Sequence, residues 1–159
     1  CELMKTLLVL YSYHHYNTDK IAKVFAKVLD AEIKTPQEIK PDELQEYDLI
    51  GFGSGIYSAK HDKSLLKLAD ELPGVNNKNV FIFSTAGITG KSKVHKDHSM
   101  LREKLESKGY TIVDEFQCKG FNTNSFLRFF GGMNKGRPNA QDLKNAEDFA
   151  VNLKENAVE

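Results

Sequence analysis

The chain has 159 residues, which is a usual length for one domain and is enough to bury a substantial core. Its 22 basic and 22 acidic side chains give a formal net charge of zero, so the sequence offers neither a basic face for nucleic acid nor attraction to an anionic membrane. Because no apolar run approaches the roughly 20 residues that cross a bilayer, we expect a single domain over residues 1–159, with its core at 4–158.

The N-terminal residues and the two cysteines predict a cytoplasmic protein. Cys1 would suit a mature bacterial lipoprotein, but Met4 is the more natural start, because a stretch that reads as a core strand begins directly after it, at Lys5. Cys118 is the other cysteine, and two cysteines do not form a disulfide framework. We therefore expect a reducing compartment.

Five short segments are predicted as strands, because continuous apolar runs of this length fit strands that are buried on both faces of a parallel sheet. They are Thr6–Tyr11, Ala31–Ile33, Asp48–Ser54, Val80–Ser84 and a last strand from Tyr110 toward Cys118. Pro36 and Pro41 predict a loop or a single turn after the second strand.

Apolar side chains at helical spacing predict four helices. These repeats run from Ile21 to Leu29, from Leu65 to Leu72, from Met100 to Leu105 and from Leu143 to Leu153. Asn17 or Thr18 is the expected N-cap of the first helix, and Asn139, with Asp142 three residues on, is that of the last. No element is assigned to the polar stretch from Thr89 to Asp97.

Alternation of strands and helices predicts an α/β fold of three layers, in which helices cover both faces of a parallel sheet. Five strands fit the doubly wound order 2-1-3-4-5. In that topology ligands bind at the carboxyl ends of the strands, beside the switch point between strands one and three. Candidate functional residues are therefore sought in the loops that follow strands one, three and four.

The loop after the first strand has the composition of a phosphate site. It leads directly into a helix, whose first N–H groups, together with hydroxyl side chains, can bind a phosphate. It contains no Lys or Arg, and an ordinary polar loop that caps the helix explains it equally well. The candidate residues are Ser12, Tyr13, His14, His15, Tyr16, Asn17 and Thr18.

The loops after strands three and four could hold the flat ring of the same ligand. Gly55 permits a close backbone approach, and Tyr57 offers an aromatic face for stacking. Each loop alone is weak evidence for a ligand site. The evidence comes from the expected position of the three loops together at one edge of the sheet. The candidate residues are Ser54, Gly55, Ile56 and Tyr57 in one loop and Ser84, Thr85, Ala86 and Gly87 in the other.

At these residues the chain resembles the flavodoxin family, from Met4 to about Val158. Asn17-Thr18 matches the end of the family's phosphate loop T/S-x-T-G-N-T, whereas the segment before it departs from that pattern, with Tyr16 in place of the usual Gly and His15 in place of the usual hydroxyl. The loops after strands three and four look like the family's two isoalloxazine loops.

The resemblance implies a non-covalently bound FMN and electron exchange with redox partner proteins. It also implies a peptide of the second loop that turns its carbonyl toward the flavin on one-electron reduction, and Gly55 is the candidate because glycine changes conformation at low cost. On this interpretation the protein is an electron carrier without catalytic residues of its own. Carriers of the family are usually strongly acidic, and this chain is neutral.

A second hypothesis comes from the segment Gly120–Arg137, which is rich in Phe and Gly. Loops of this length are commonly functional, and this one could form a lid, an apolar dock for a quinone, a homodimer contact, or a surface loop packed on the core. Flavodoxin-type protoporphyrinogen oxidases share this architecture with an extra segment there. The alternative is therefore an FMN-dependent oxidoreductase that acts on a quinone or a porphyrinogen.

A phospho-receiver domain has the same strand order, but it would need acidic residues after the first strand and an Asp at the end of the third. The chain has Ser12, Tyr13 and Ser54 at those places, which argues against this class. His61, His95 and His98 are expected on a solvated surface rather than at a metal site. Cys118 is expected to be a buried, inert thiol.

Overall fold

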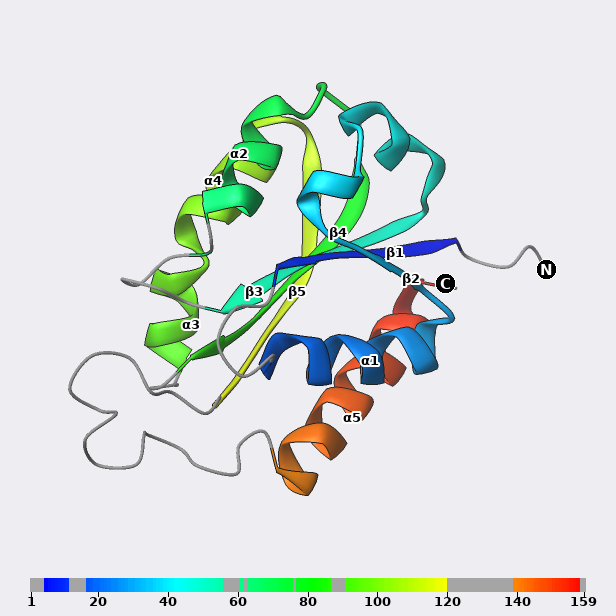
Figure 1. The fold of residues 1–159 in the computed structure, drawn as a ribbon, viewed down its shortest axis with the longest axis vertical. Helices are drawn as coiled ribbons and strands as arrows, with labels where there is room; N and C mark the ends of the chain where they lie inside the picture. The colour runs from blue at the N-terminus through cyan, green and yellow to red at the C-terminus, as the bar shows by residue number, and fades with distance from the viewer. Residues whose placement is uncertain are drawn as a thin grey trace.

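The computed structural model describes residues 5–11, 17–55, 61, 63–75, 77–86, 91–119 and 139–157. Five parallel strands form a sheet in the order β2-β1-β3-β4-β5, which confirms the predicted topology (Figure 1). The strands are β1 (Thr6–Tyr11), β2 (Glu32–Lys34), β3 (Leu49–Gly55), β4 (Lys78–Ala86) and β5 (Tyr110–Lys119). All of them run in one direction, so their carboxyl ends share one edge of the sheet.

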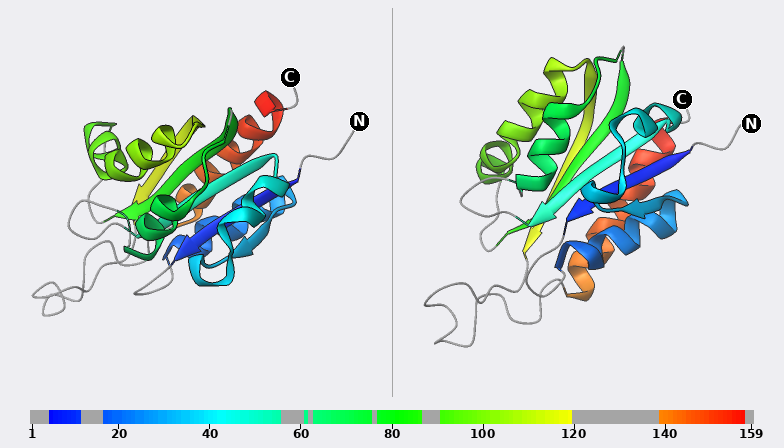
Figure 2. Two further views of the ribbon diagram at one scale, coloured as in Figure 1. Left: turned by 90° about the horizontal axis from the view of Figure 1, so that it is seen from above. Right: turned by 45° about the horizontal axis from the view of Figure 1, so that its top comes forward.

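Helices cover both faces of this sheet, as Figure 2 shows. The helices are α1 (Asn17–Leu29), α2 (Lys63–Glu71), α3 (Lys91–Asp97), α4 (Ser99–Ser107) and α5 (Ala140–Ala157). One layer contains α1 and α5, and the other contains α2, α3 and α4. The segment after β2, where a loop or a single turn was expected, forms two 3-10 helices, η1 (Pro36–Glu38) and η2 (Pro41–Glu46). None of the helices among these residues is long and apolar enough to span a membrane.

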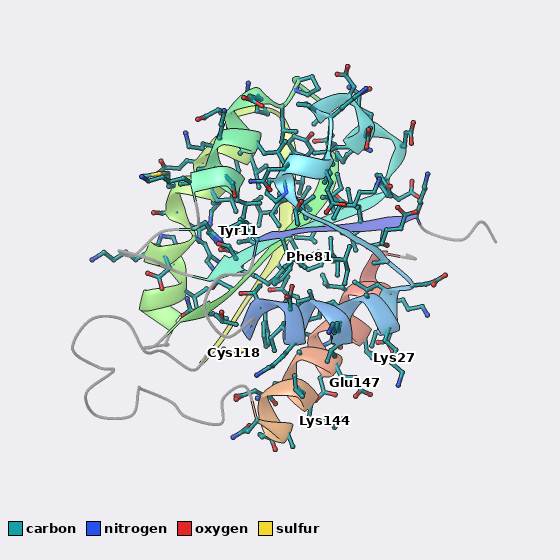
Figure 3. The ribbon with its side chains drawn as sticks, viewed as in Figure 1. Tyr11, Lys27, Phe81, Cys118, Lys144 and Glu147 are labelled. Atoms are coloured by element: carbon teal, nitrogen blue, oxygen red, sulfur yellow. The ribbon has the colours of Figure 1, made fainter. Side chains whose placement is uncertain are left out.

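Each face of the sheet has its own apolar core. On the side of α1 and α5, Phe25 packs edge-on against Phe81, Phe83 and Phe116, with ring centroids 5.1–5.7 Å apart. Such pairs add about 0.5–1.5 kcal/mol each beyond the burial of their area. Figure 3 shows Phe81 between the sheet and α1. On the other side, α2 and α4 bury leucines against Ile50, Phe52, Val80 and Ile82.

The pairing of β4 with β5 contains one irregularity. Val80 pairs with Ile112, but the next residue, Phe81, pairs with Asp114, so that Val113 is an extra residue in β5. Its side chain is 44% exposed. A bulge of this kind leaves one residue unpaired and bends the strand.

The N-terminus of α5 forms the predicted capping box. The backbone N–H of Asp142 donates to Asn139 Oδ1 at 2.9 Å, and the backbone N–H of Asn139 donates to Asp142 Oδ2 at 2.8 Å. Two N–H groups that have no partner within the helix are thereby satisfied.

Two predictions on local structure were wrong. The polar stretch before α4 contains a helix of its own, α3, which the lack of apolar periodicity hid. Thr18 is the second residue of α1 rather than its N-cap, because its hydroxyl bonds to another strand instead of to the helix backbone. Asn17 is the first helical residue, so the cap of α1 lies outside the described residues.

The turn between α4 and β5 contains a glycine that other residues could replace only with strain. Gly109 has φ +95°, and a Cβ there would lie 1.8 Å from the Val75 carbonyl oxygen. We expect Gly109→Ala to lower the free energy of unfolding, measured in urea, by at least about 2 kcal/mol, since strain and overlap add. Gly74→Ala is the matched control, because its Cβ would have no atom nearer than 4.0 Å. The control should stay within about 0.5 kcal/mol of the parent protein, and equal losses would contradict this account.

Candidate functional site

The carboxyl edge of the sheet carries a row of polar side chains in place of the apolar core. Phe52 in β3 and Ile82 in β4 point into the core on the side of α2 and α4. Two residues later, on the same face, both strands present a buried serine. The row of paired residues across four strands consists of Tyr11, Ser54, Ser84 and Gln117. The sheet thus changes from apolar to polar where ligands bind in this topology.

On the opposite face, the first turn of α1 is tied to the end of β4. The hydroxyls of Thr18 and Thr85 lie 2.9 Å apart and form a buried hydrogen bond. Thr18 follows the loop after β1, and Thr85 precedes the loop after β4, so the bond joins two of the three predicted ligand loops. Asp19, in the same turn, has its pKa raised by burial, although nearby Lys23 lowers it.

His98, in the turn between α3 and α4, is completely buried and uses both ring nitrogens. Its Nδ1 lies 2.9 Å from Glu115 Oε1, and its Nε2 lies 2.7 Å from Ser84 Oγ. A carboxylate can only accept, so Nδ1 carries the proton that is donated to Glu115. The Ser84 hydroxyl then donates to Nε2 and accepts the amide N–H of Gln117 at 3.2 Å. This assignment gives a hydrogen-bond partner to each ring nitrogen of His98 and to the Ser84 hydroxyl.

Glu115 is held by a second partner, Arg102 of α4. Arg102 donates through Nε to Oε2 at 2.9 Å and through Nη2 to Oε1 at 2.6 Å, in the two-pronged geometry that makes such pairs strong. Burial alone would raise the pKa of Glu115. Hydrogen bonds from His98 and Arg102, followed by the electrostatic attraction of Arg102 and of His98, outweigh burial and lower this pKa from 4.5 to about 2. Glu115 is therefore ionised at neutral pH.

His61 lies between the end of β3 and α2 and is 1% exposed. Its Nδ1 is 2.9 Å from Ser54 Oγ, and its ring lies against that of His98, with centroids 4.9 Å apart and planes inclined by 39°. Its Nε2 is buried without a hydrogen-bond partner among the described residues. Burial first, and then His98, lower the pKa of His61 well below 6.5, so the ring is neutral in this state.

Burial of His61 and His98 corrects the expectation of solvated surface histidines. The sequence around both is polar, but both rings are buried, His61 against Ser54 at the end of β3 and His98 against Ser84 at the end of β4. His95 is exposed, as expected. Cys118 is buried, also as expected, and Figure 3 places it near the end of β5. No group of three His, Cys, Asp or Glu side chains in the described part of the chain could hold a metal ion.

The structure brings together five of the predicted ligand residues at one edge of the sheet. Thr18, Ser54, Gly55, Ser84 and Thr85 lie at the start of α1 or at the ends of β3 and β4. The backbones of Asn17 and Ala86 belong to the same elements. The remaining candidates lie outside the described residues: Ser12, Tyr13, His14, His15, Tyr16, Ile56, Tyr57 and Gly87.

Sequence reasoning missed the residues that pack around the two buried serines. They are His61, Asp97, His98, Arg102, Glu115 and Gln117. A usable signal was present in β5, where Glu115 and Gln117 alternate with Phe116 and Cys118 at a period of two. Such alternation predicts one apolar and one polar face in a strand, and a buried sheet needs partners for the polar face.

Comparisons with known proteins agree with this geometry. A family model described as flavodoxin domain matches residues 8–154. A protein of Methanocaldococcus jannaschii that is named only as uncharacterized is 49% identical over 154 residues, which cover 96% of this chain and 100% of that protein.

Solved structures with much lower identity share the fold. Oxidised Flavodoxin 2 from Bacillus cereus has a TM-score of 0.71 at 18% identity, and the match covers 96% of this chain and 99% of that one. A Fusobacterium nucleatum flavodoxin bound to flavin mononucleotide has a TM-score of 0.66 at 15% identity, again over 96% and 99% of the two chains. At these identities the two structures establish the fold.

The Glu115 pairs predict a specific dependence of stability on pH. A carboxyl whose folded pKa is about 2 stabilises the protein above its unfolded value near 4.5, and this contribution is lost as the pH falls from about 4.5 to about 2. We expect Glu115→Gln to remove this dependence of the unfolding free energy on pH and to lower that free energy by roughly 1–2 kcal/mol at pH 7. Urea unfolding at several pH values measures both effects. Glu106→Gln, at an exposed site on α4, should keep the parent slope. Parallel curves for the parent and Glu115→Gln would refute the role of these pairs.

Proposed function

The chain belongs to the flavodoxin domain family, and from this we propose that it is an electron-transfer protein that binds FMN non-covalently at the carboxyl edge of its sheet. The supporting observation is the strand order β2-β1-β3-β4-β5, which puts the switch point between β1 and β3. Ligands of doubly wound sheets bind at that point, outside the carboxyl ends of the strands. The buried hydroxyls of Thr18, Ser54, Ser84 and Thr85 lie at the same edge.

The phosphate of FMN would bind where β1 leads into α1. A helix N-terminus supplies N–H donors and a positive dipole end, which suits a loop without Lys or Arg. We assign the phosphate to residues 12–18, with the hydroxyl and imidazole groups of Ser12, His14 and His15 as further donors. The Thr18–Thr85 hydrogen bond would fix the position of this turn against β4.

The isoalloxazine ring would lie between the loops after β3 and β4. Gly55 and Tyr57 would provide the mobile peptide and the stacking face, and residues 84–87 the groups for the polar edge of the ring. The described residues fit such a ligand, because the buried Nε2 of His61 has no partner among them and lies one hydrogen bond from Ser54. A buried polar atom of this kind is costly unless a ligand or water satisfies it.

Bound FMN would supply one- and two-electron redox chemistry, and the protein's own residues would bind, orient and tune it. The partners would be redox proteins in a reducing cytoplasm, with no role for nucleic acid or membranes. A formal net charge of zero gives no strong long-range field of one sign. Partner recognition would therefore depend on local contacts more than on electrostatic steering.

A second candidate function is an FMN-dependent oxidoreductase that acts on a quinone or a porphyrinogen. The observation in its favour is the Phe- and Gly-rich segment Gly120–Arg137, which follows β5 at the proposed cofactor edge. In this alternative the segment would form part of an apolar substrate site. The same segment as a homodimer contact would be consistent with either function.

Cofactor binding can be tested by titrating the purified protein with FMN and with riboflavin, which lacks the phosphate, while flavin fluorescence is recorded. We expect saturation at one FMN per chain and affinity for riboflavin that is weaker by roughly tenfold or more. Asn17→Ala should weaken FMN binding but not riboflavin binding, whereas Tyr57→Ala should weaken both. The two variants control for each other, and the proposal fails if the parent protein binds neither flavin.

Steady-state turnover separates the carrier from the oxidoreductase. A carrier should reduce no quinone from NADH or NADPH until a separate flavodoxin reductase is added. An oxidoreductase should turn over directly, and deletion of residues 121–136 should abolish its activity while FMN binding is retained. Quinone reduction by the parent protein without an added reductase would contradict the carrier function and favour the oxidoreductase.

A further inference from the structure

The His61–His98 pair is a buried cluster of titratable groups that FMN binding alone does not explain. The two rings lie 4.9 Å apart beneath the ends of β3 and β4 and are 1% and 0% exposed. Burial of two imidazoles side by side opposes the charging of either ring, because a charged group loses hydration and a second charge would repel it. A structural role would be filled at lower cost by apolar side chains.

The two rings are not equivalent. Both nitrogens of His98 have hydrogen-bond partners, Glu115 at Nδ1 and Ser84 at Nε2. His61 has one partner, Ser54, at Nδ1, and its Nε2 has none among the described residues. Among the described residues, Nε2 of His61 is therefore the ring nitrogen of the pair without a partner, and it can take up a proton in the tautomer whose Nδ1 donates to Ser54.

Charged side chains lie next to the pair on three elements. From β5, ionised Glu115 faces His98, and from α4, Arg102 neutralises part of that charge. Near the end of α3, Asp97 accepts a hydrogen bond from Gln117 at 2.9 Å. Burial and the neighbouring His98 keep His61 neutral in the ligand-free protein, and negative charge added nearby would favour its protonation.

We propose that His61 takes up a proton at Nε2 when the bound FMN is reduced, an inference that rests on the proposed function. The electron comes from the reductant, which is a redox partner protein in the cell or dithionite in the test. The proton comes from solvent and forms the N–H bond at Nε2, so the negative charge added to the site is matched by one positive charge on His61. Ser54, which holds Nδ1, ties the ring to the residue before Gly55.

The proton on His61 can be observed directly by NMR of protein that is labelled with ¹⁵N-histidine, because ring ¹⁵N shifts separate neutral from charged imidazole. Three states are compared between pH 5 and pH 8: ligand-free, FMN-loaded and oxidised, and FMN-loaded and fully reduced by dithionite. We expect His61 to be neutral at pH 7 in the first two states. Full reduction should raise its ratio of charged to neutral ring at least tenfold at the same pH.

The reduction potential provides an independent readout. When one proton is taken up per electron, the one-electron potential changes by 59 mV for each pH unit, which corresponds to a tenfold change in the equilibrium constant. The cofactor's own proton contributes equally to all variants, so the difference between variants isolates His61. We expect the slope of potential against pH to be shallower in His61→Asn, which keeps a polar group near Ser54 but cannot be charged. His95→Asn, at an exposed histidine on α3, should keep the parent slope.

The outcomes separate this inference from the function on which it rests. Binding of FMN with His61 neutral in all three states, or with equal slopes in the parent protein and His61→Asn, would overturn the inference and leave the function standing. A charged His61 in the ligand-free protein at pH 7 would overturn it before any flavin is added. Failure of the parent protein to bind FMN would overturn both. The NMR titration uses the parent protein and does not depend on the folding of His61→Asn.

Discussion

The hydrogen bond from His98 to Glu115 is the contact on which the polar edge of this sheet depends. Serines at the ends of β3 and β4 replace core residues, and each needs a partner that can be buried with it. His98 supplies one and is itself fixed by a carboxylate that Arg102 keeps ionised. Without that anchor the imidazole could adopt the other tautomer, and Ser84 would lose its acceptor. A polar layer can thus lie inside an otherwise apolar fold.

Much of the fold could be predicted because the relevant signals are local. The apolar run of β1 and the capping residues Asn139 and Asp142 each act within a few residues, and the structure confirms both. The strand order followed from alternation of elements. The helix α3 could not be predicted, because it is polar and short and depends on packing against neighbours rather than on its own periodicity.

The site could be predicted only in outline, since sequence shows which residues follow a strand but not what covers them. Ser54, Ser84 and Thr85 were identified from their loops, whereas His61 and His98 were expected in solvent. Both histidines lie in polar stretches, and only the arrangement of α2, α3 and α4 encloses them. Their partners are distant in the chain: Ser84 and Glu115 are 14 and 17 residues from His98. Such pairs arise from topology, which local patterns do not encode.

The extra residue in β5, Val113, determines which of the later side chains of this strand lie on which face of the sheet. Side chains alternate along a strand, so leaving one residue out of the ladder exchanges the two faces for all residues that follow it. Past Val113, this exchange turns Glu115 and Gln117 toward His98 and sends Phe116 into the aromatic cluster around Phe25. Regular pairing of the same residues, without the bulge, would put Glu115 beside Phe83 and Phe116 beside Ser84, that is, a carboxylate among phenylalanines and a phenyl ring against a serine. Removing Val113 would leave these later pairs as they are, whereas a shift of β5 by one residue against β4 would exchange the two faces, so the polar edge depends on the register of β5 rather than on its length.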